Sequence, residues 1–178
     1  FGSPYAVLNL SKIGLRYFRI CILASEDSKE KLLKNFINHP NIGWVFSAEG
    51  WFNIAIGIWA QSNSEINEIS TAIRKNLDSK DTIVYQSELT SLHGFGNRPI
   101  KKNNKPMTIV DSVQCSFELN HLELDYLKVL TLDSSIPDKE MSEILGVTED
   151  SIVEMNHKLT KEGIIVGYQE RINYSGFY

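Results

Sequence analysis

Histidine and cysteine are the side chains of this chain with the widest scope for metal binding and nucleophilic chemistry. No two of them are spaced as Cys-x-x-Cys or His-x-x-x-His, the spacings at which neighbouring side chains commonly share a metal ion. The sequence also lacks a Gly-x-Ser-x-Gly motif and a glycine-rich phosphate loop. We therefore expect no catalytic residue, no metal site and no cofactor, and we predict that the chain is not an enzyme. The residues concerned are His39, His93, His121, His157, Cys21 and Cys115.

Charged side chains are unevenly distributed along the chain. The net charge is -4, which does not match the strongly basic surface of a typical nucleic-acid binder. Residues 96–106 contain Arg98, Lys101, Lys102 and Lys105 and no acid, which indicates a basic linker. Residues 121–170 contain four lysines against eleven acids, a net charge of -7. The charge therefore changes sign between the linker and the segment that follows it.

Length and composition predict a folded protein of one large or two small domains. The chain has 178 residues, of which 42% are hydrophobic and 22% charged. Its longest mostly apolar run, Phe52–Ala60, is far shorter than the roughly 20 residues that a membrane helix needs. No secretory signal opens the chain, and two cysteines do not make a disulfide scaffold. We expect a cytoplasmic protein with no membrane partner, and Phe1 suggests that the chain begins inside a longer protein.

The hydrophobic pattern of the first half alternates between strand and helix periods. Antiparallel pairing is expected between two strands that a short glycine-containing connection joins at Gly50. Either Ser64 or Asn63 is expected to cap the second helix. The resulting order is the ferredoxin-like βαββαβ unit. The predicted elements are strand Leu15–Ser25, helix Lys29–His39, strands Ile42–Ser47 and Phe52–Ala60, helix Ser64–Leu77 and strand Thr82–Leu92.

The second half has the pattern of a helix-turn-helix. After an extended segment, Met107–Leu119, three helices are predicted, and Gly146 supplies the short turn between the last two. A strand at Ile164–Val166 follows. The fold class is α+β, with a ferredoxin-like domain at 1–95, a basic linker and extended segment at 96–120, and a winged helix-turn-helix domain at 121–178. The predicted helices are Leu122–Leu132, Pro137–Leu145 and Thr148–Lys161.

These residues resemble the Lrp/AsnC (feast/famine) family of transcriptional regulators. The βαββαβ unit is similar to the family's effector-binding RAM domain, and Gly50-Trp51-Phe52-Asn53 lies at its Gly-x-x-Asp turn. The resemblance covers most of the chain, and its order departs from the family, in which the helix-turn-helix usually comes first. The helix-turn-helix match rests on Glu123, Tyr126-Leu127, Val129-Leu130, Asp133, Ile136, Glu140-Met141-Ser142, Gly146-Val147-Thr148, Ile152, Lys158-Leu159 and Glu162-Gly163-Ile164-Ile165-Val166-Gly167-Tyr168.

A truncated tandem would explain the unusual order. Asn9-Leu10-Ser11 near the start resembles Asn173-Tyr174-Ser175 near the end, and in the family such a segment joins the DNA-binding unit to the RAM unit. We expect the parent protein to have a helix-turn-helix before Phe1, a second RAM domain after Tyr178, or both.

The resemblance implies a small-molecule effector, such as an amino acid, at the hairpin turn of the RAM unit. Glycine there allows close approach of backbone amides to a carboxylate, and Glu49 can pair with an ammonium group. Asn53 stands where the family has an acid. The resemblance also implies a homodimer or higher oligomer. The predicted effector-binding residues are Ser47, Glu49, Gly50, Trp51 and Asn53.

The resemblance further implies that the third helix enters the major groove of double-stranded DNA. Glu149, Asp150 and Glu154 on that helix would repel phosphates, so DNA binding by this unit alone should be weak. Met155 stands where the family usually has arginine. The predicted DNA-binding residues are Thr148, Ser151, Met155, Lys158 and Lys161.

Three functions remain open at the level of sequence. The leading prediction is a DNA-binding transcriptional regulator that senses a small metabolite. The first alternative is an enzyme like the siroheme decarboxylases, which share this two-part architecture, with the four histidines as testable contacts. The second is a co-regulator whose degenerate helix-turn-helix contacts protein.

Overall fold

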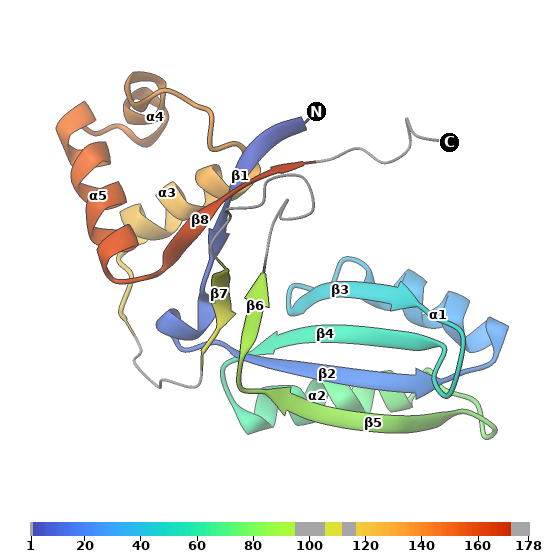
Figure 1. Ribbon diagram of the computed structural model, residues 1–178. Coiled ribbons are helices and arrows are strands. Elements are labelled where there is room, and N and C mark those ends of the chain that lie inside the picture. The colour runs from blue at the N-terminus through green and yellow to red at the C-terminus, as the bar shows by residue number, and fades with distance from the viewer. Residues whose placement is uncertain (1, 95–105, 112–116, 172–178) are drawn as a thin grey trace. The chain divides into compact units, whose positions relative to one another are not determined.

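The computed structural model describes residues 2–94, 106–111 and 117–171, and the chain divides into two compact units (Figure 1). The sheet unit is Leu15–Thr90, and the winged-helix unit combines Phe1–Gly14 with Ser91–Tyr178. Within the described ranges, no helix is long and apolar enough to cross a membrane. The basic segment 96–105, Cys115 and the repeat-like Asn173-Tyr174-Ser175 lie outside the described residues.

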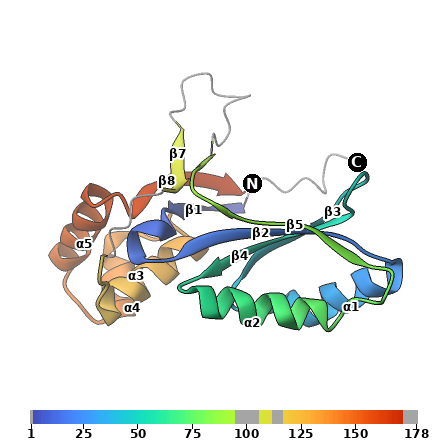
Figure 2. The same ribbon diagram turned by 90° about the horizontal axis from the view of Figure 1, so that it is seen from below.

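The sheet unit is ferredoxin-like, as predicted. Its four antiparallel strands lie in the order β3-β4-β2-β5, and both helices cover the same face of the sheet (Figure 2). The hairpin pairing of β3 with β4 is confirmed. The elements are β2 (Arg16–Leu23), α1 (Glu26–Phe36), β3 (Ile42–Ser47), β4 (Ile54–Ala60), α2 (Asn63–Arg74) and β5 (Thr82–Leu89).

Alternation along the strands creates the core beneath the two helices. Alternate residues from Phe18 to Ile22 in β2 and from Ile54 to Ala60 in β4 are apolar and almost fully buried, as a strand with one covered face requires. Ser62, rather than the predicted Ser64 or Asn63, caps α2, because it has the extended backbone and its side chain accepts a hydrogen bond from Glu65 N. The core comprises Phe18, Ile20, Ile22, Leu32, Phe36, Ile54, Ile56, Ile58, Ile66, Ile69 and Ile73, with Ala24 and Ala60.

The winged-helix unit confirms the predicted helix-turn-helix. Gly146, with a φ of +68°, makes the turn between α4 and α5, a backbone conformation that favours glycine. Thr148 caps α5. The elements are β1 (Gly2–Leu8), the 3-10 helix η1 (Leu10–Ile13), β6 (Leu92–Gly94), β7 (Met107–Val110), α3 (His121–Leu132), α4 (Asp138–Leu145), α5 (Glu149–Lys161) and β8 (Ile165–Arg171).

The first fourteen residues group with the winged-helix unit, whereas the sequence placed residues 1–95 in the sheet domain. The reason is that β1 pairs antiparallel with β8, with Ala6 opposite Tyr168 (Figure 1). Ala6 is buried in the same core as Tyr126, Ile152 and Leu159. The strand partner of β1 is thus supplied by the far end of the chain, and no local sequence pattern reveals such a pairing.

Candidate functional site

The sheet face opposite the helices is lined with aromatic rings. Side chains alternate along a strand, so residues between the core positions of β2 and β4 point away from α1 and α2. Directly opposed residues share a face, which places Trp44 beside Gly57 and Tyr17 beside Trp59. We call this surface the open face. Its residues are Tyr17, Arg19 and Cys21 on β2, Trp44 and Phe46 on β3, Gly57 and Trp59 on β4, and Tyr85 on β5.

Four rings of the open face form a continuous series. Tyr17 lies 4.6 Å from Trp59 and 6.5 Å from Trp44, measured between ring centroids. Trp44 stacks on Phe46 at 5.0 Å and donates a hydrogen bond from Nε1 to the Tyr17 hydroxyl. Rings at these separations attract one another beyond simple burial. The series continues into the β3–β4 hairpin, since Phe52 lies 6.4 Å from Phe46 and 4.8 Å from Trp51.

Gly57 makes room for these rings. A Cβ atom there would lie 2.5 Å from Trp44 Nε1 and 2.6 Å from the Tyr17 hydroxyl oxygen, which is closer than real side chains approach. Gly43 has a milder constraint, because its Cβ would lie 3.1 Å from Trp59 Nε1. The absence of a side chain at position 57 therefore leaves room for the Trp44 and Tyr17 side chains beside β4.

Arg19 is the one formally charged residue of the open face. It is paired across the sheet with Gly57 and Ser87, and its guanidinium lies over the Tyr85 ring, 5.8 Å from the centroid. Its Nε is buried and has no hydrogen-bond partner among the described residues. Buried donors are nearly always satisfied in folded proteins. The Nε of Arg19 is therefore a buried donor beside the Tyr85 ring, without an acceptor in the described part of the chain.

Tyr17 and Cys21, which flank Arg19 on β2, are uncharged at neutral pH. Burial raises the pKa of the Tyr17 phenol, and this outweighs the lowering by the Trp44 hydrogen bond and by the charge of Arg19. Burial likewise raises the pKa of the Cys21 thiol, against the smaller effect of Arg19. The open face is therefore an aromatic surface with one cation. It can stack a planar ring system and pair with an anionic group.

Four of the five predicted effector residues lie together at the β3–β4 turn. Ser47, Glu49, Gly50 and Trp51 are exposed there, and Gly50 has a φ of +141° with open space where a Cβ would be. The fifth residue, Asn53, instead makes its side-chain hydrogen bonds to the backbone of Ala24. Its Oδ1 accepts from Ala24 N at 2.9 Å, and its Nδ2 donates to Ala24 O at 2.7 Å. Its amide therefore holds the end of β2 to the hairpin instead of facing a ligand.

The predicted DNA contacts on α5 differ in their surroundings. Met155 is only 8% exposed and packs in the core of the winged-helix unit, which corrects its assignment as a DNA contact. Thr148 accepts a hydrogen bond from Ser151 N at 3.3 Å, and the two hydroxyl groups are 2.9 Å apart. Both polar groups therefore serve the cap of α5. Lys161 is exposed.

Lys158 is engaged with α3. Its Nζ donates to Glu123 Oε1 at 2.6 Å and lies 5.1 Å from the centroid of the Phe117 ring. Glu123 also forms a capping box with Asn120, accepting from Asn120 N at 3.0 Å. Sequence analysis included Glu123 in the family pattern but did not find this pair, because 35 residues separate its members.

Comparisons with known proteins complete this picture. No protein-family model matches the chain, and no curated protein matches it. Among solved structures, the siroheme decarboxylase NirDL matches with a TM-score of 0.64 at 12% sequence identity, covering 94% of this chain and 49% of that chain. The chain has the Lrp/AsnC-like fold. It spans about half the length of NirDL.

Two further solved structures extend the comparison. NirDL in complex with an iron-uroporphyrin III analogue matches with a TM-score of 0.62, at 12% identity and 94% coverage of this chain and 49% of that chain. MtbAldR matches with a TM-score of 0.42 at 14% identity, over 52% of this chain and 64% of that chain. At 12% identity, the similarity to NirDL shows the fold and not a shared activity.

The histidines of this Lrp/AsnC-like fold are dispersed. His39 is the one histidine of the sheet unit, and it packs against Phe36, away from the open face. His93 lies between the hydroxyl groups of Ser91 and Thr108, at 2.9 and 3.3 Å. In the described part of the chain, no group of three or more His, Cys, Asp or Glu side chains is placed to hold a metal ion.

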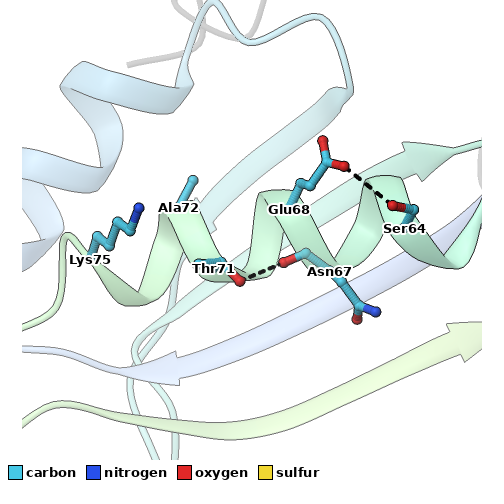
Figure 3. Close-up of a pocket in the computed structure, with 6 residues that line it drawn as sticks. All are labelled: Ser64, Asn67, Glu68, Thr71, Ala72 and Lys75. Atoms are coloured by element: carbon cyan, nitrogen blue, oxygen red, sulfur yellow. Dashed lines mark hydrogen bonds between the residues drawn. The ribbon is translucent and has the colours of Figure 1, made fainter.

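A shallow depression also runs along the outer side of α2 (Figure 3). All of its lining comes from one helix, and Ser64 donates to Glu68 at 3.2 Å while Thr71 donates to the Asn67 carbonyl at 2.8 Å. These groups are already satisfied within the helix and do not converge on a ligand. The lining residues are Ser64, Asn67, Glu68, Thr71, Ala72 and Lys75.

Proposed function

We propose that the sheet unit binds a planar, anionic tetrapyrrole on its open face. The observation that carries this proposal is Arg19, whose buried Nε has no hydrogen-bond acceptor among the residues that the structure describes while its guanidinium lies against Tyr85. A carboxylate at the rim of a macrocycle would pair with the guanidinium group of Arg19 through charge-assisted hydrogen bonds. The flat ring system would stack on the aromatic side chains around it.

The side chains of the open face suit the ring and its carboxylates better than a central metal. No histidine lies among them, so the described sheet unit offers no imidazole there to ligate iron. Similarity to NirDL, solved with an iron-uroporphyrin III analogue, supports this class of ligand through the shared fold. The open face also presents no imidazole or carboxylate as a general base, and we propose binding rather than catalysis.

Titration of the full chain with uroporphyrin III tests the proposal. All three tryptophans of the chain, Trp44, Trp51 and Trp59, belong to the open face or its adjoining turn. Intrinsic fluorescence therefore reports on this surface, and we expect the ligand to quench it while its own absorption band shifts. Because recognition uses the ring and its carboxylates, the metal-free and iron forms should bind with similar affinity.

Paired variants separate specific binding from adsorption. Arg19→Ala should weaken binding about 10- to 100-fold, because a charge-assisted hydrogen bond is lost. Arg74→Ala, which removes an exposed arginine from α2, should leave affinity unchanged. Absence of binding by the wild-type chain, or an equal effect of the two substitutions, would refute the proposal. Turnover of siroheme by the chain would instead establish an enzyme.

A DNA-binding transcriptional regulator is the second candidate function. It is favoured by the complete helix-turn-helix, with α5 capped by Thr148 and followed by the β1–β8 pair. Such a regulator would bind a small effector, such as an amino acid, at the β3–β4 turn and double-stranded DNA as a homodimer or higher oligomer. Fluorescence anisotropy with mixed genomic and A·T-rich duplexes across a salt series tests it. Affinity that falls steeply with salt would support DNA binding.

A further inference from the structure

The outer side of α5, the last helix of the helix-turn-helix, exposes a stripe of side chains that contains acids and an apolar residue. Asp150, Val153, Glu154, His157 and Lys161 recur three and four residues apart, which places them on one side of the helix. The opposite side carries the core residues Ile152, Met155 and Leu159. Val153 is 54% exposed in the middle of this stripe. The exposed side of α5 thus combines an apolar centre with acids.

The neighbouring helix α4 also exposes an apolar side chain. Ile144 on α4 is 53% exposed, close to the turn that leads into α5. A shallow groove between the helices brings Val153 together with Asp138 at the start of α4. The groove is lined by Asp138, Val153, Asn156, His157, Thr160 and Lys161.

The charge of the α4–α5 surface favours cationic partners over phosphates. The helices α4 and α5 carry six acids against the three lysines Lys139, Lys158 and Lys161. Lys158 is bound to Glu123 on α3, so its charge is already compensated. Phosphates would be repelled by the first half of α5, whereas lysine and arginine side chains would be attracted. The acids are Asp138, Glu140, Glu143, Glu149, Asp150 and Glu154.

We propose that the α4–α5 surface docks a basic, amphipathic segment of a partner protein. The apolar side of that segment would cover Val153 and Ile144, whose side chains are otherwise exposed to water. Its lysine or arginine side chains would pair with the acids around them and guide the approach. The helix-turn-helix geometry is kept in this arrangement, and its last helix serves as a protein-binding surface. This inference does not rest on the proposed ligand of the open face.

Binding of a defined probe to the full chain tests the inference. The probe is a fluorescein-labelled synthetic helix with leucines on one side and lysines on the other. Anisotropy should show saturable binding that weakens with salt. Val153→Asp should reduce affinity about tenfold or more, because it places a charge at the apolar centre of the contact. Val84→Asp, at a β5 position that is 40% exposed, is the matched control and should have no effect.

Charge reversal provides the second pair of variants. The triple change Glu149→Lys, Asp150→Lys and Glu154→Lys should abolish probe binding. The matched triple Glu26→Lys, Asp27→Lys and Glu30→Lys removes acids from the start of α1 and should preserve it. Because first-turn acids also stabilise each helix, circular dichroism must show that both triples are folded.

Hydrogen exchange of the wild-type chain keeps the inference testable if a variant unfolds. The probe should slow exchange of amides in α4 and α5 and leave those of α1 and α2 unchanged. Protection elsewhere, equal losses in both members of a variant pair, or no binding by the wild type would overturn the inference. Tighter binding of duplex DNA than of the probe, lost in Lys161→Ala, would overturn it in favour of DNA recognition.

Discussion

Lys158 Nζ on α5 lies 2.6 Å from Glu123 Oε1 on α3, and the glutamate side chain is only 3% exposed. Burial alone would raise the pKa of this carboxyl. The hydrogen bonds from Lys158 and from Asn120 N outweigh burial, so the pKa of Glu123 lies below its ordinary value. The pair joins α3 and α5, the first and last α-helices of the described winged-helix unit. It also engages a lysine that the sequence analysis predicted to contact DNA.

The Glu123–Lys158 pair should make stability depend on pH. A carboxyl with a lowered pKa contributes stability at pH values above its unfolded pKa, and this contribution is lost as the pH falls through the folded pKa. Glu123→Gln should therefore reduce the free energy of unfolding at neutral pH by about 1 to 3 kcal/mol and flatten its acid dependence. Urea unfolding of the wild type and variant at pH 7 and at acid pH measures both effects.

Asp125→Asn is the matched control for this pair. Asp125 forms an ion pair with Lys128 on the same helix, but both side chains are more than half exposed. Exposed pairs of this kind contribute less than about 1 kcal/mol. An Asp125→Asn loss as large as that of Glu123→Gln, or an unchanged acid profile in Glu123→Gln, would contradict the assigned role.

The sequence predicted local elements better than distant pairings. Periodicity located β3 to the residue, and glycine and cap chemistry located the turn between α4 and α5, because these signals come from neighbours in the chain. The pairing of β1 with β8 and the contact of Lys158 with Glu123 join residues far apart in sequence. Such contacts form only when distant segments of the chain pack together, so no local sequence pattern reveals them.

Gly57 should be required for the arrangement of the open face. Gly57→Ala places a methyl group against Trp44 and Tyr17, and we expect a loss of about 1 to 3 kcal/mol of unfolding free energy with a shifted tryptophan emission. Gly50→Ala is the control, because it strains the backbone at a φ of +141° but contacts no ring. It should destabilise the chain without shifting the emission. Equal emission spectra for the two variants would show that position 57 does not determine how the Trp44 and Tyr17 rings are arranged.

Asn53 should be intolerant of the acid that the family carries at this position. Its Nδ2 donates to Ala24 O, and an ionised carboxylate cannot donate a hydrogen bond. Asn53→Asp should therefore cost about 1 to 3 kcal/mol at neutral pH. Part of the loss should be recovered at acid pH, where the carboxyl carries a proton. A thermal unfolding series from pH 4 to 7, run beside the wild type, would detect this recovery, and a variant as stable as the wild type throughout would contradict it.

The candidate site shows where sequence reasoning is limited. The turn residues Glu49 and Gly50 were recognisable by type, but the open face draws its rings from four different strands. Arg19 carried no signal in the sequence, since a single arginine in a strand is ordinary. Its importance emerges only from the lack of an acceptor for its buried Nε among the described residues.

Met155 and Val153 should respond in opposite ways to arginine. Met155 is 8% exposed and belongs to the core, so Met155→Arg buries an unpaired charge and should destabilise the chain by about 3 kcal/mol or more. Val153 is 54% exposed, so Val153→Arg should leave stability within about 0.5 kcal/mol of the wild type. Thermal unfolding measures both. Val153→Arg also adds a cation to the outer side of α5, and DNA affinity should rise more in this variant than in any folded Met155→Arg protein. A stable Met155→Arg variant with improved DNA binding would mean that position 155 reaches the major groove of DNA, as the family pattern predicts. It would also mean that α5 can turn its core side toward solvent.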